Sequence, residues 1–244
     1  MELAILGSGA AFADTGHQAG YLVDSRLLLD CGAPATVLLP RMGFSISALE
    51  AVLISHLHGD HVGQLSTLLA ARTERFPDSP PLQVVGPRGL AEHLHLLGCL
   101  NLGERFWKEI ESRSHLRVRE VQDGHRELIG EHQIEVFEVE HSQQLHCLAF
   151  RIEAGGVSLG YSGDTTYCPG IRRLASCVDH LLCECTGWSA PAPIHLWKDE
   201  VEQLMLEAPQ AKFILTHLSE RRPVPGAILA SDGLRLCLRR PVRD

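Results

Sequence analysis

Short apolar runs alternate with helix-like stretches along this chain. The run at residues 49–54 is apolar and rich in β-branched side chains, whereas residues 62–75 carry apolar side chains at helical spacing. Residues 116–121 and 133–139 alternate apolar with charged side chains, which predicts half-exposed strands. The same criteria predict strands at 2–6, 20–23, 26–30, 82–85, 148–153, 157–161, 180–183 and 212–215, and helices at 34–42, 90–97 and 200–207.

The order of these elements indicates the fold class. The strands come in two batches, and helical segments follow each batch. The last two apolar runs, 228–230 and 234–238, flank Asp232-Gly233 and predict a closing hairpin. Residues 46–49 add a turn of helix, and residues 102–110 fit neither the helical nor the strand pattern clearly. This order favours two mainly antiparallel sheets packed face to face with helices outside over one parallel sheet, so we expect a mixed α/β (α+β) fold.

Composition predicts one globular domain over residues 1–244. Hydrophobic residues make up 45% and charged residues 21% of the 244 positions, which allows a sizeable core. No Pro/Gly/Ser-rich linker or repeat of fixed period divides the chain. No apolar run approaches the roughly 18 residues that cross a bilayer, and the first residues lack the basic and apolar regions of a signal peptide. We therefore predict a cytoplasmic protein without a membrane partner.

The charge and the cysteines exclude two classes of protein. The net charge of −8 disfavours sequence-independent binding to nucleic acid, which needs Lys and Arg to neutralise phosphates. The 8 cysteines contain no Cys-x-x-Cys pair, so neither a thiolate zinc knuckle nor a thioredoxin-like motif is indicated. A disulfide framework is not expected in a cytosolic chain of this size, and we interpret the cysteines as small buried hydrophobes.

The strongest chemical signal directly follows the apolar run 51–55. It reads His56-Leu57-His58-Gly59-Asp60-His61, with three imidazoles and one carboxylate within six positions. These are ligand types that zinc and related ions prefer. One ion cannot easily take all four side chains, so the spacing suggests two neighbouring sites that need further ligands.

Further ligands are expected at the tips of other predicted strands, where rigid backbone holds a side chain beside open loops. Three residues meet this criterion. His141 ends the strand at 133–139, Asp164 follows the strand at 157–161, and His217 follows the strand at 212–215. Together with the opening motif they predict a metal-dependent site.

These residues resemble the metallo-β-lactamase superfamily and, within it, the ribonuclease Z-like phosphodiesterase branch. The matching segments run in order along nearly the whole chain: Gly7-Ser8-Gly9-Ala10, Leu28-Leu29-Asp30-Cys31-Gly32, Ser55–His61, His141-Ser142, Ser162-Gly163-Asp164-Thr165 and Leu215–Arg221. The resemblance implies a four-layer αββα sandwich. It also implies that His56, His58 and His141 hold one metal, that Asp60, His61 and His217 hold a second, and that Asp164 bridges them.

The resemblance also implies a mechanism. Two divalent ions would share a bridging water and lower its pKa, so that a metal-bridging hydroxide attacks the phosphate. Asp60 could orient this water and take its proton. By position in the family pattern, Glu184 and His195 would move a proton to the leaving group, although Leu196-Trp197 replaces the small hydroxyl residues that often follow that histidine. Zinc is the first expectation for the metal, with manganese or iron as alternatives.

One departure from the family pattern affects the substrate. Ribonuclease Z carries a long tRNA-gripping arm between the equivalents of His141 and Asp164, whereas here only residues 142–163 lie between them, and two predicted strands fill most of that interval. With the acidic net charge, this makes nucleic acid a doubtful partner and tRNA 3′ processing a weaker prediction. A small phosphodiester, such as a cyclic nucleotide or a short nucleotide ester, is the preferred substrate.

Several alternatives stay open on sequence alone. The same scaffold could hydrolyse a carboxyl ester, thioester or lactone, since fold does not fix substrate. The pair Arg221 and Arg222 could clamp a phosphate or be solvated, and His17 could reach the mouth of the site. Trp188 and Trp197 could stack on a base or pack in the core. Relatives of this kind are often homodimers, so we carry a homodimer as an expectation.

Overall fold

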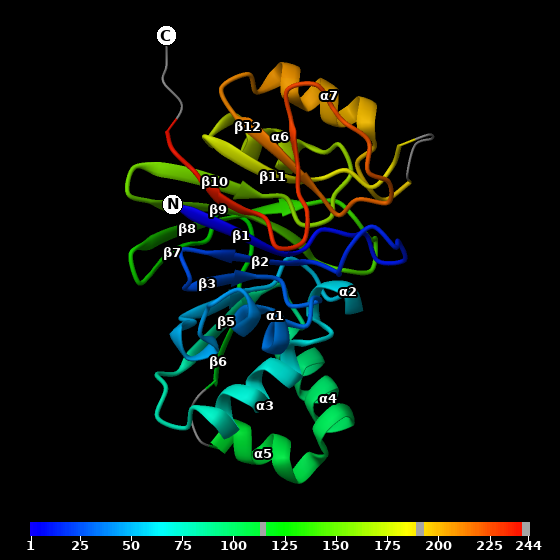
Figure 1. Cartoon of the computed structure of the whole chain (residues 1–244). Coiled ribbons are helices and arrows are strands. Elements are labelled where there is room, and N and C mark those ends of the chain that lie inside the picture. Colours follow the sequence, from blue (N-terminus) through cyan, green and yellow to red (C-terminus); the bar gives the residue numbers. More distant parts are fainter. Residues whose placement is uncertain (113–115, 189–192, 241–244) are drawn as a thin grey trace.

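Within the described residues, 1–112, 116–188 and 193–240, the computed structural model forms two seven-stranded sheets that lie face to face (Figure 1). The first sheet has the order β14-β1-β2-β3-β4-β5-β6 and the second β13-β12-β11-β10-β9-β8-β7. The strands of the first sheet are β1 (Glu2–Gly7), β2 (Gly20–Val23), β3 (Leu27–Leu29), β4 (Ala51–Leu53), β5 (Leu82–Gly86), β6 (Leu116–Glu120) and β14 (Arg235–Cys237). Those of the second are β7 (Arg126–Ile129), β8 (His132–Val139), β9 (Cys147–Ala154), β10 (Val157–Tyr161), β11 (His180–Glu184), β12 (Lys212–Thr216) and β13 (Ile228–Leu229).

Helices cover the outer face of each sheet. The helices against the first sheet include α1 (Ala35–Arg41), α3 (Leu65–Arg75), α4 (Leu90–Leu102) and α5 (Glu104–Ser112), and α6 (Pro169–Ser176) and α7 (Lys198–Glu207) cover the second (Figure 1). The short helices η1 (Ile46–Ala48) and α2 (Gly59–Val62) are the remaining helices of the described residues.

Three separate clusters of buried side chains fill the spaces between these layers. Leu29, Phe150 and Leu182 belong to the cluster between the two sheets. Trp107 lies in the cluster that joins the first sheet to its helices, and Leu204 in the cluster beneath α6 and α7. Three cores require four layers, so the predicted αββα sandwich is confirmed.

The pairing within the sheets differs from the prediction of mainly antiparallel strands. In the first sheet β3, β4, β5 and β6 run parallel, and in the second β10, β11, β12 and β13 do. The predicted closing hairpin is also wrong. Its first strand, β13, pairs with β12, whereas its second, β14, pairs with β1 in the other sheet. The turn at Asp232-Gly233 thus carries the chain from one sheet to the other.

Several helical boundaries also differ. The helix predicted at residues 62–75 is interrupted at Gly63-Gln64, which separates α2 from α3. The helix predicted at 90–97 continues to Leu102, and most of the unassigned stretch 102–110 belongs to α5. Neither β7 nor α6 was predicted. Five cysteines are buried as expected, but Cys177 and Cys237 are exposed, and all eight are free thiols.

The topology brings the ends of many strands to one edge of the sandwich. Strands β8 and β10 both pair antiparallel with β9, so their carboxyl ends lie on the same side, and β11 and β12 run parallel to β10. The chain leaves β3 and β4 of the first sheet at their shared carboxyl edge as well. Parallel strands with adjacent carboxyl ends commonly frame a site. Within the described residues, no helix combines the length and apolarity needed to cross a bilayer.

Candidate metal centre

The loop after β4 and the short helix α2 present the four polar residues of the opening motif. His56 and His58 lie in the loop, and Asp60 and His61 lie in α2. The exit of β3 holds α2 in place, because the Cys31 amide donates to the His61 carbonyl at 2.6 Å. A Cβ on Gly32 would lie 1.6 Å from the Asp60 carbonyl oxygen, so this close approach requires glycine.

The second sheet supplies the other three predicted ligands. His141 follows β8, Asp164 follows β10 and His217 follows β12. The backbone of His217 is left-handed, with φ of 52°, a conformation that costs a non-glycine residue roughly 1–2 kcal/mol. Such strain is typical of functional positions, where the surrounding structure fixes the side chain.

Three imidazoles form a first cluster. His56 Nε2 lies 3.0 Å from His58 Nδ1, and His141 Nε2 lies 3.1 Å from the same atom. His56 and His141 are buried, whereas His58 is half-buried. One nitrogen of each ring therefore points to a common centre, as in a three-histidine metal site.

Two carboxylates and two imidazoles form a second cluster. His61 Nε2 lies 3.3 Å from Oδ2 of both Asp60 and Asp164. His217 Nε2 lies 3.2 Å from Asp60 Oδ2 and 3.4 Å from Asp164 Oδ2. A tetrahedral zinc ion with ligands at about 2.0 Å has neighbouring ligand atoms about 3.3 Å apart, so these four atoms fit one divalent ion.

Two buried atoms support this interpretation. His61 Nε2 and Asp164 Oδ1 have no hydrogen-bond partner, although each is shielded from solvent. Buried polar atoms are normally paired, and an unpaired one needs a reason such as an ion. Asp164 Oδ2 also lies 3.9 Å from both His56 Nε2 and His141 Nε2, so the same oxygen faces both clusters.

The tautomers of the histidines follow from their other hydrogen bonds. His61 Nδ1 donates to Asp30 Oδ2 at 2.6 Å, and His141 Nδ1 donates to the Ile194 carbonyl at 2.6 Å. Thr186 Oγ1 donates to Glu184, so it accepts from His217 Nδ1 at 2.8 Å. In each ring Nδ1 carries a proton, so Nε2 is the nitrogen that a cation can take.

The charges within the site are strongly coupled. Burial alone would lower the pKa of His61, but the carboxylates of Asp164 and Asp30 outweigh it and raise that pKa well above the usual range. Burial alone would raise the pKa of Asp164, whereas His217 and His61 hold it well below its ordinary value. Burial alone would raise the pKa of Asp60, but the neighbouring imidazoles of His217 and His61 outweigh it and lower that pKa. Both carboxylates are therefore anionic, which suits a cation ligand.

The structure also brings together the predicted proton-transfer pair. Glu184 is fully buried at the end of β11, and its Oε1 lies 3.1 Å from His195 Nδ1. The same carboxylate accepts from the Thr165 amide at 2.6 Å and from Thr186 Oγ1 at 2.6 Å. Burial alone would lower the pKa of His195, but Glu184 raises it to about 9.

A cavity of about 510 Å³ opens over both clusters, and its lining includes His58, Asp60, His141, Asp164 and His195. This volume lies within the usual range for small-molecule sites.

The residues whose roles the sequence leaves undecided either bind other groups of the protein or do not line the cavity. Arg221 donates to the Ala230 carbonyl at 2.5 Å, and Arg222 pairs with Glu220 at 2.5 Å, so both guanidinium groups are engaged by the protein. His17 does not line the cavity, although its neighbour Gln18 does. Trp188 is buried in the core beneath α6 and α7. Trp197 is half-buried at the start of α7 and does not line the cavity either.

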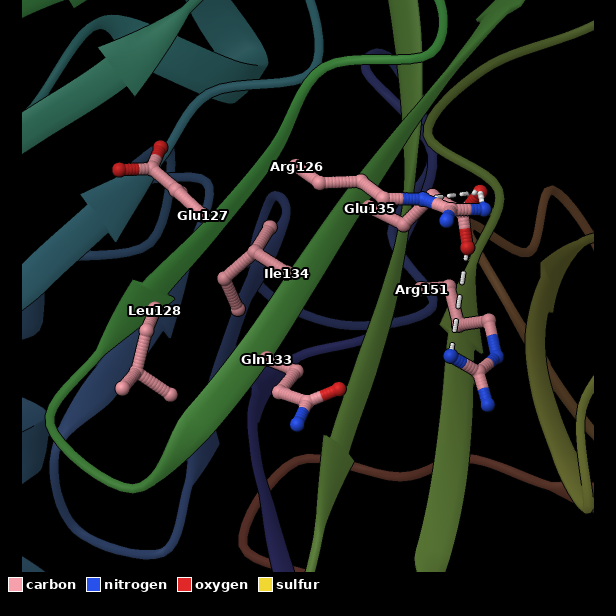
Figure 2. A pocket seen from close by; sticks show the side chains of 7 residues that line it. All are labelled: Arg126, Glu127, Leu128, Gln133, Ile134, Glu135 and Arg151. Atoms are coloured by element: carbon pink, nitrogen blue, oxygen red, sulfur yellow. Dashed lines mark hydrogen bonds and ion pairs between the residues drawn. The ribbon is translucent and has the colours of Figure 1, made fainter.

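A different hollow, of about 400 Å³, lies along β7, β8 and β9 (Figure 2). Glu135 pairs with Arg126 at 2.5 Å and with Arg151 at 4.0 Å, and Figure 2 shows these contacts as dashed lines. None of the predicted site residues lines it. Because Glu135 pairs with both arginines of the lining and Glu127 pairs with Arg119, the hollow offers little to a charged ligand.

Sequence reasoning missed the residues that orient the ligands. Asp30 is fully buried and accepts hydrogen bonds from His61, Ser55 and Tyr161, yet the sequence indicates it only as part of a segment that matches the family. Thr186 was not singled out either. The available signal was a lone carboxylate directly after the apolar run Leu27–Leu29, and a hydroxyl two residues after Glu184.

Comparison with known proteins identifies the family of this chain. The family model described as anti-Pycsar protein Apyc1 matches residues 1–225. A ribonuclease Z of Mycolicibacterium gilvum is 30% identical over 188 residues, which cover 72% of this chain and 65% of that protein. The match thus spans slightly less than two thirds of the length of that curated relative.

Solved structures show the same fold. The metallo-β-lactamase fold protein YhfI from Bacillus subtilis superposes with a TM-score of 0.76 at 21% identity, covering 96% of this chain and 98% of that one. The short form of human tRNase Z gives a TM-score of 0.74 at 21% identity, covering 99% and 100%. The chain therefore belongs to the anti-Pycsar Apyc1 family, within the metallo-β-lactamase superfamily and close to its ribonuclease Z-like branch.

Proposed function

We propose that the protein is a two-metal phosphodiesterase that hydrolyses a small phosphodiester, with a cyclic nucleotide as the preferred substrate. The observation that carries this proposal is the pair of ligand clusters that share Asp164 Oδ2. The first ion would be held by His56, His58 and His141, and the second by Asp60, His61 and His217. When bound, two such ions supply a water nucleophile at neutral pH and neutralise the charge that develops on the phosphate.

The roles of the protein groups follow from their contacts. Glu184 fixes His195 through Nδ1, so Nε2 is the ring nitrogen that can donate a proton to the leaving oxygen. Glu184 raises the pKa of this imidazole in the metal-free chain, which favours the protonated form that a general acid requires. Asp60 is an anionic ligand with a lowered pKa, and its further role as a proton acceptor stays a prediction.

Two observations favour a small substrate. Strands β9 and β10 take up most of the interval between His141 and Asp164, where an inserted arm would otherwise lie. The description anti-Pycsar fits hydrolysis of a cyclic nucleotide, and ribonuclease Z relatives cleave phosphodiester bonds in RNA. Zinc is the favoured metal because imidazole nitrogens dominate the ligand set, with manganese and iron as alternatives. The single domain, the homodimer and the cytoplasmic location stay predictions.

The test is a substrate panel on the metal-free chain supplemented with Zn²⁺ or Mn²⁺. It includes 2′,3′- and 3′,5′-cyclic nucleotides, linear dinucleotides, bis(p-nitrophenyl) phosphate, p-nitrophenyl acetate and a lactone. We expect turnover of cyclic nucleotides that His61→Ala abolishes and that His93→Ala, a histidine substitution on α4, retains. Faster turnover of the carboxyl ester or the lactone than of every phosphodiester would instead support the alternative hydrolase.

A further inference from the structure

A large aromatic side chain stands fully in solvent at the mouth of the metal centre. Phe12 has a relative exposure of 103%, so its ring packs against almost nothing in the protein. It nevertheless lines the cavity of about 510 Å³ that holds the proposed ligands. It also lines an adjoining hollow of about 610 Å³, which shares His195 and His217 with the first. An apolar ring that adds little packing stability to the fold but lines a cavity over the proposed ligands points to a role in binding.

The turn that carries Phe12 is fixed to the site. The Ala13 amide donates to the Ala10 carbonyl at 3.1 Å and closes a tight turn with Phe12 near its tip. The Ala10 amide donates to the Leu218 carbonyl at 3.1 Å, and Thr15 Oγ1 donates to the same oxygen. Leu218 directly follows the proposed ligand His217, so the backbone ties the position of Phe12 to that of the metal centre.

A second exposed apolar side chain is fixed in the same way. Ile194 is 42% exposed and lines the same cavity. Its carbonyl oxygen accepts the Nδ1 proton of His141 at 2.6 Å. The cavity thus combines a polar floor of proposed metal ligands with two apolar side chains. Hydrogen bonds of the backbone hold one of these side chains beside His217 and the other beside His141.

We propose that Phe12 and Ile194 hold the flat base of a nucleotide whose phosphate lies on the metal centre. This inference rests on the proposed function, because it assigns the polar floor to the phosphate. A base is the part of such a substrate that has apolar faces, and an aromatic side chain stacks on any base with little dependence on its identity. This clamp, formed by Phe12 and Ile194, therefore selects for the presence of a base and tolerates different bases.

The test measures binding rather than turnover. Isothermal titration of the zinc-loaded chain compares adenosine 5′-monophosphate with ribose 5-phosphate, which has the same phosphate but no base. Both are phosphomonoesters, so a phosphodiesterase does not consume them. We expect the wild-type chain to bind the nucleotide about tenfold more tightly, which corresponds to about 1.4 kcal/mol of stacking.

Variants show whether the preference for the nucleotide depends on Phe12 and Ile194 in particular. Phe12→Ala is expected to bring the ratio of the two dissociation constants close to one, Ile194→Ala to lower it less, and Phe12→Trp to preserve it. Leu100→Ala is the matched control, because Leu100 is 83% exposed on α4 and does not line this cavity. It should keep the wild-type ratio.

The outcomes are distinguishable. A ratio near one in the wild-type chain, a ratio that survives Phe12→Ala, or failure of both ligands to bind would overturn the clamp. A preference for the nucleotide that depends on Phe12, in a chain that hydrolyses no phosphodiester of the panel, would support the clamp and refute the proposed function.

Discussion

Asp30 is the most informative residue to change, because it orients the site without contacting substrate. Its Oδ1 accepts from the Ser55 amide at 2.7 Å, and its Oδ2 accepts from Ser55 Oγ at 2.7 Å, from His61 Nδ1 at 2.6 Å and from Tyr161. Every partner donates, so the group must be an acceptor at both oxygens. Asp30→Asn keeps the shape but replaces one acceptor by an NH₂ group, which has only hydrogens to offer.

The expected losses of stability and of metal affinity follow from the hydrogen bonds that Asp30 accepts. If the amide oxygen faces the three donors at Oδ2, the NH₂ group faces the Ser55 amide, and a buried donor is left unpaired at a cost of about 1–3 kcal/mol of stability. His61 also loses a charged partner that holds its ring and fixes its tautomer. Loss of such a partner typically lowers metal affinity about 10- to 100-fold, or about 1.4–2.7 kcal/mol.

The assay is zinc affinity by competition with a chromophoric chelator, together with urea unfolding of the metal-free chain. Asp179→Asn is the matched control, since Asp179 Oδ2 likewise accepts from the amide and hydroxyl of one serine, Ser158, at 2.9 and 2.8 Å. Asp179 precedes β11 at the end opposite to the metal centre. Both variants should lose stability, but only Asp30→Asn should lose zinc affinity. Equal zinc affinity in the two variants would exclude an orienting role of Asp30 at the metal centre.

Three further predictions concern protons and orientation. Glu184→Gln removes the charge that raises the pKa of His195 to about 9, so the alkaline limb of the kcat profile should move towards the ordinary value of about 6.5; an unmoved limb would contradict the pairing. Bound cations lower that pKa in both proteins, so the shift rather than the absolute limb is diagnostic. Thr186→Val should lower zinc affinity about tenfold by releasing His217 Nδ1, and Thr186→Ser should restore it; equal affinity in the two variants would exclude a hydrogen-bonding role. Because the raised pKa of His61 means that a proton competes with the metal, zinc affinity should fall from pH 8 to pH 6, and a flat profile would contradict that charge state.

The clustering of the candidate ligands was more predictable than the sheet pairing. Every ligand predicted from the sequence lies just past the end of a strand, in the adjoining loop or, for Asp60 and His61, in the short helix α2 that follows it, because apolar runs locate strands and polar residues just past them stand out. The direction in which two strands pair leaves no comparable local signal. The short apolar runs of β10, β11 and β12 would look the same in an antiparallel sheet, and only the crossover helices decide the matter.

The wrong hairpin shows a long-range contact that overrides a local signal. Asp232 accepts from the Ser8 amide at 3.0 Å, from Ser8 Oγ at 2.9 Å and from the His17 amide at 2.7 Å. These bonds fix the turn to the loop between β1 and β2. Leu236 then pairs with Leu3 rather than with the strand before the turn. A turn motif specifies a reversal of the chain, but not that its two arms pair with each other.

The missed helix α6 has a different cause. It opens with Pro169-Gly170, a dipeptide that usually marks a turn. Here the proline occupies the first turn of the helix, where its missing amide costs nothing. The glycine allows close packing, since a Cβ at Gly170 would lie 1.9 Å from the Glu138 carbonyl oxygen. The Pro-Gly dipeptide therefore marks the start of a helix and its close contact with β8, and not a turn.

The central claim is that two ions act together at the ligands that share Asp164. The most direct measurement is initial rate against equivalents of zinc added to the metal-free chain, with the best phosphodiester of the panel. If both ions are required, activity stays low up to one equivalent of zinc and its rise ends at two equivalents. Full activity at one equivalent, or none at any ratio, would contradict it.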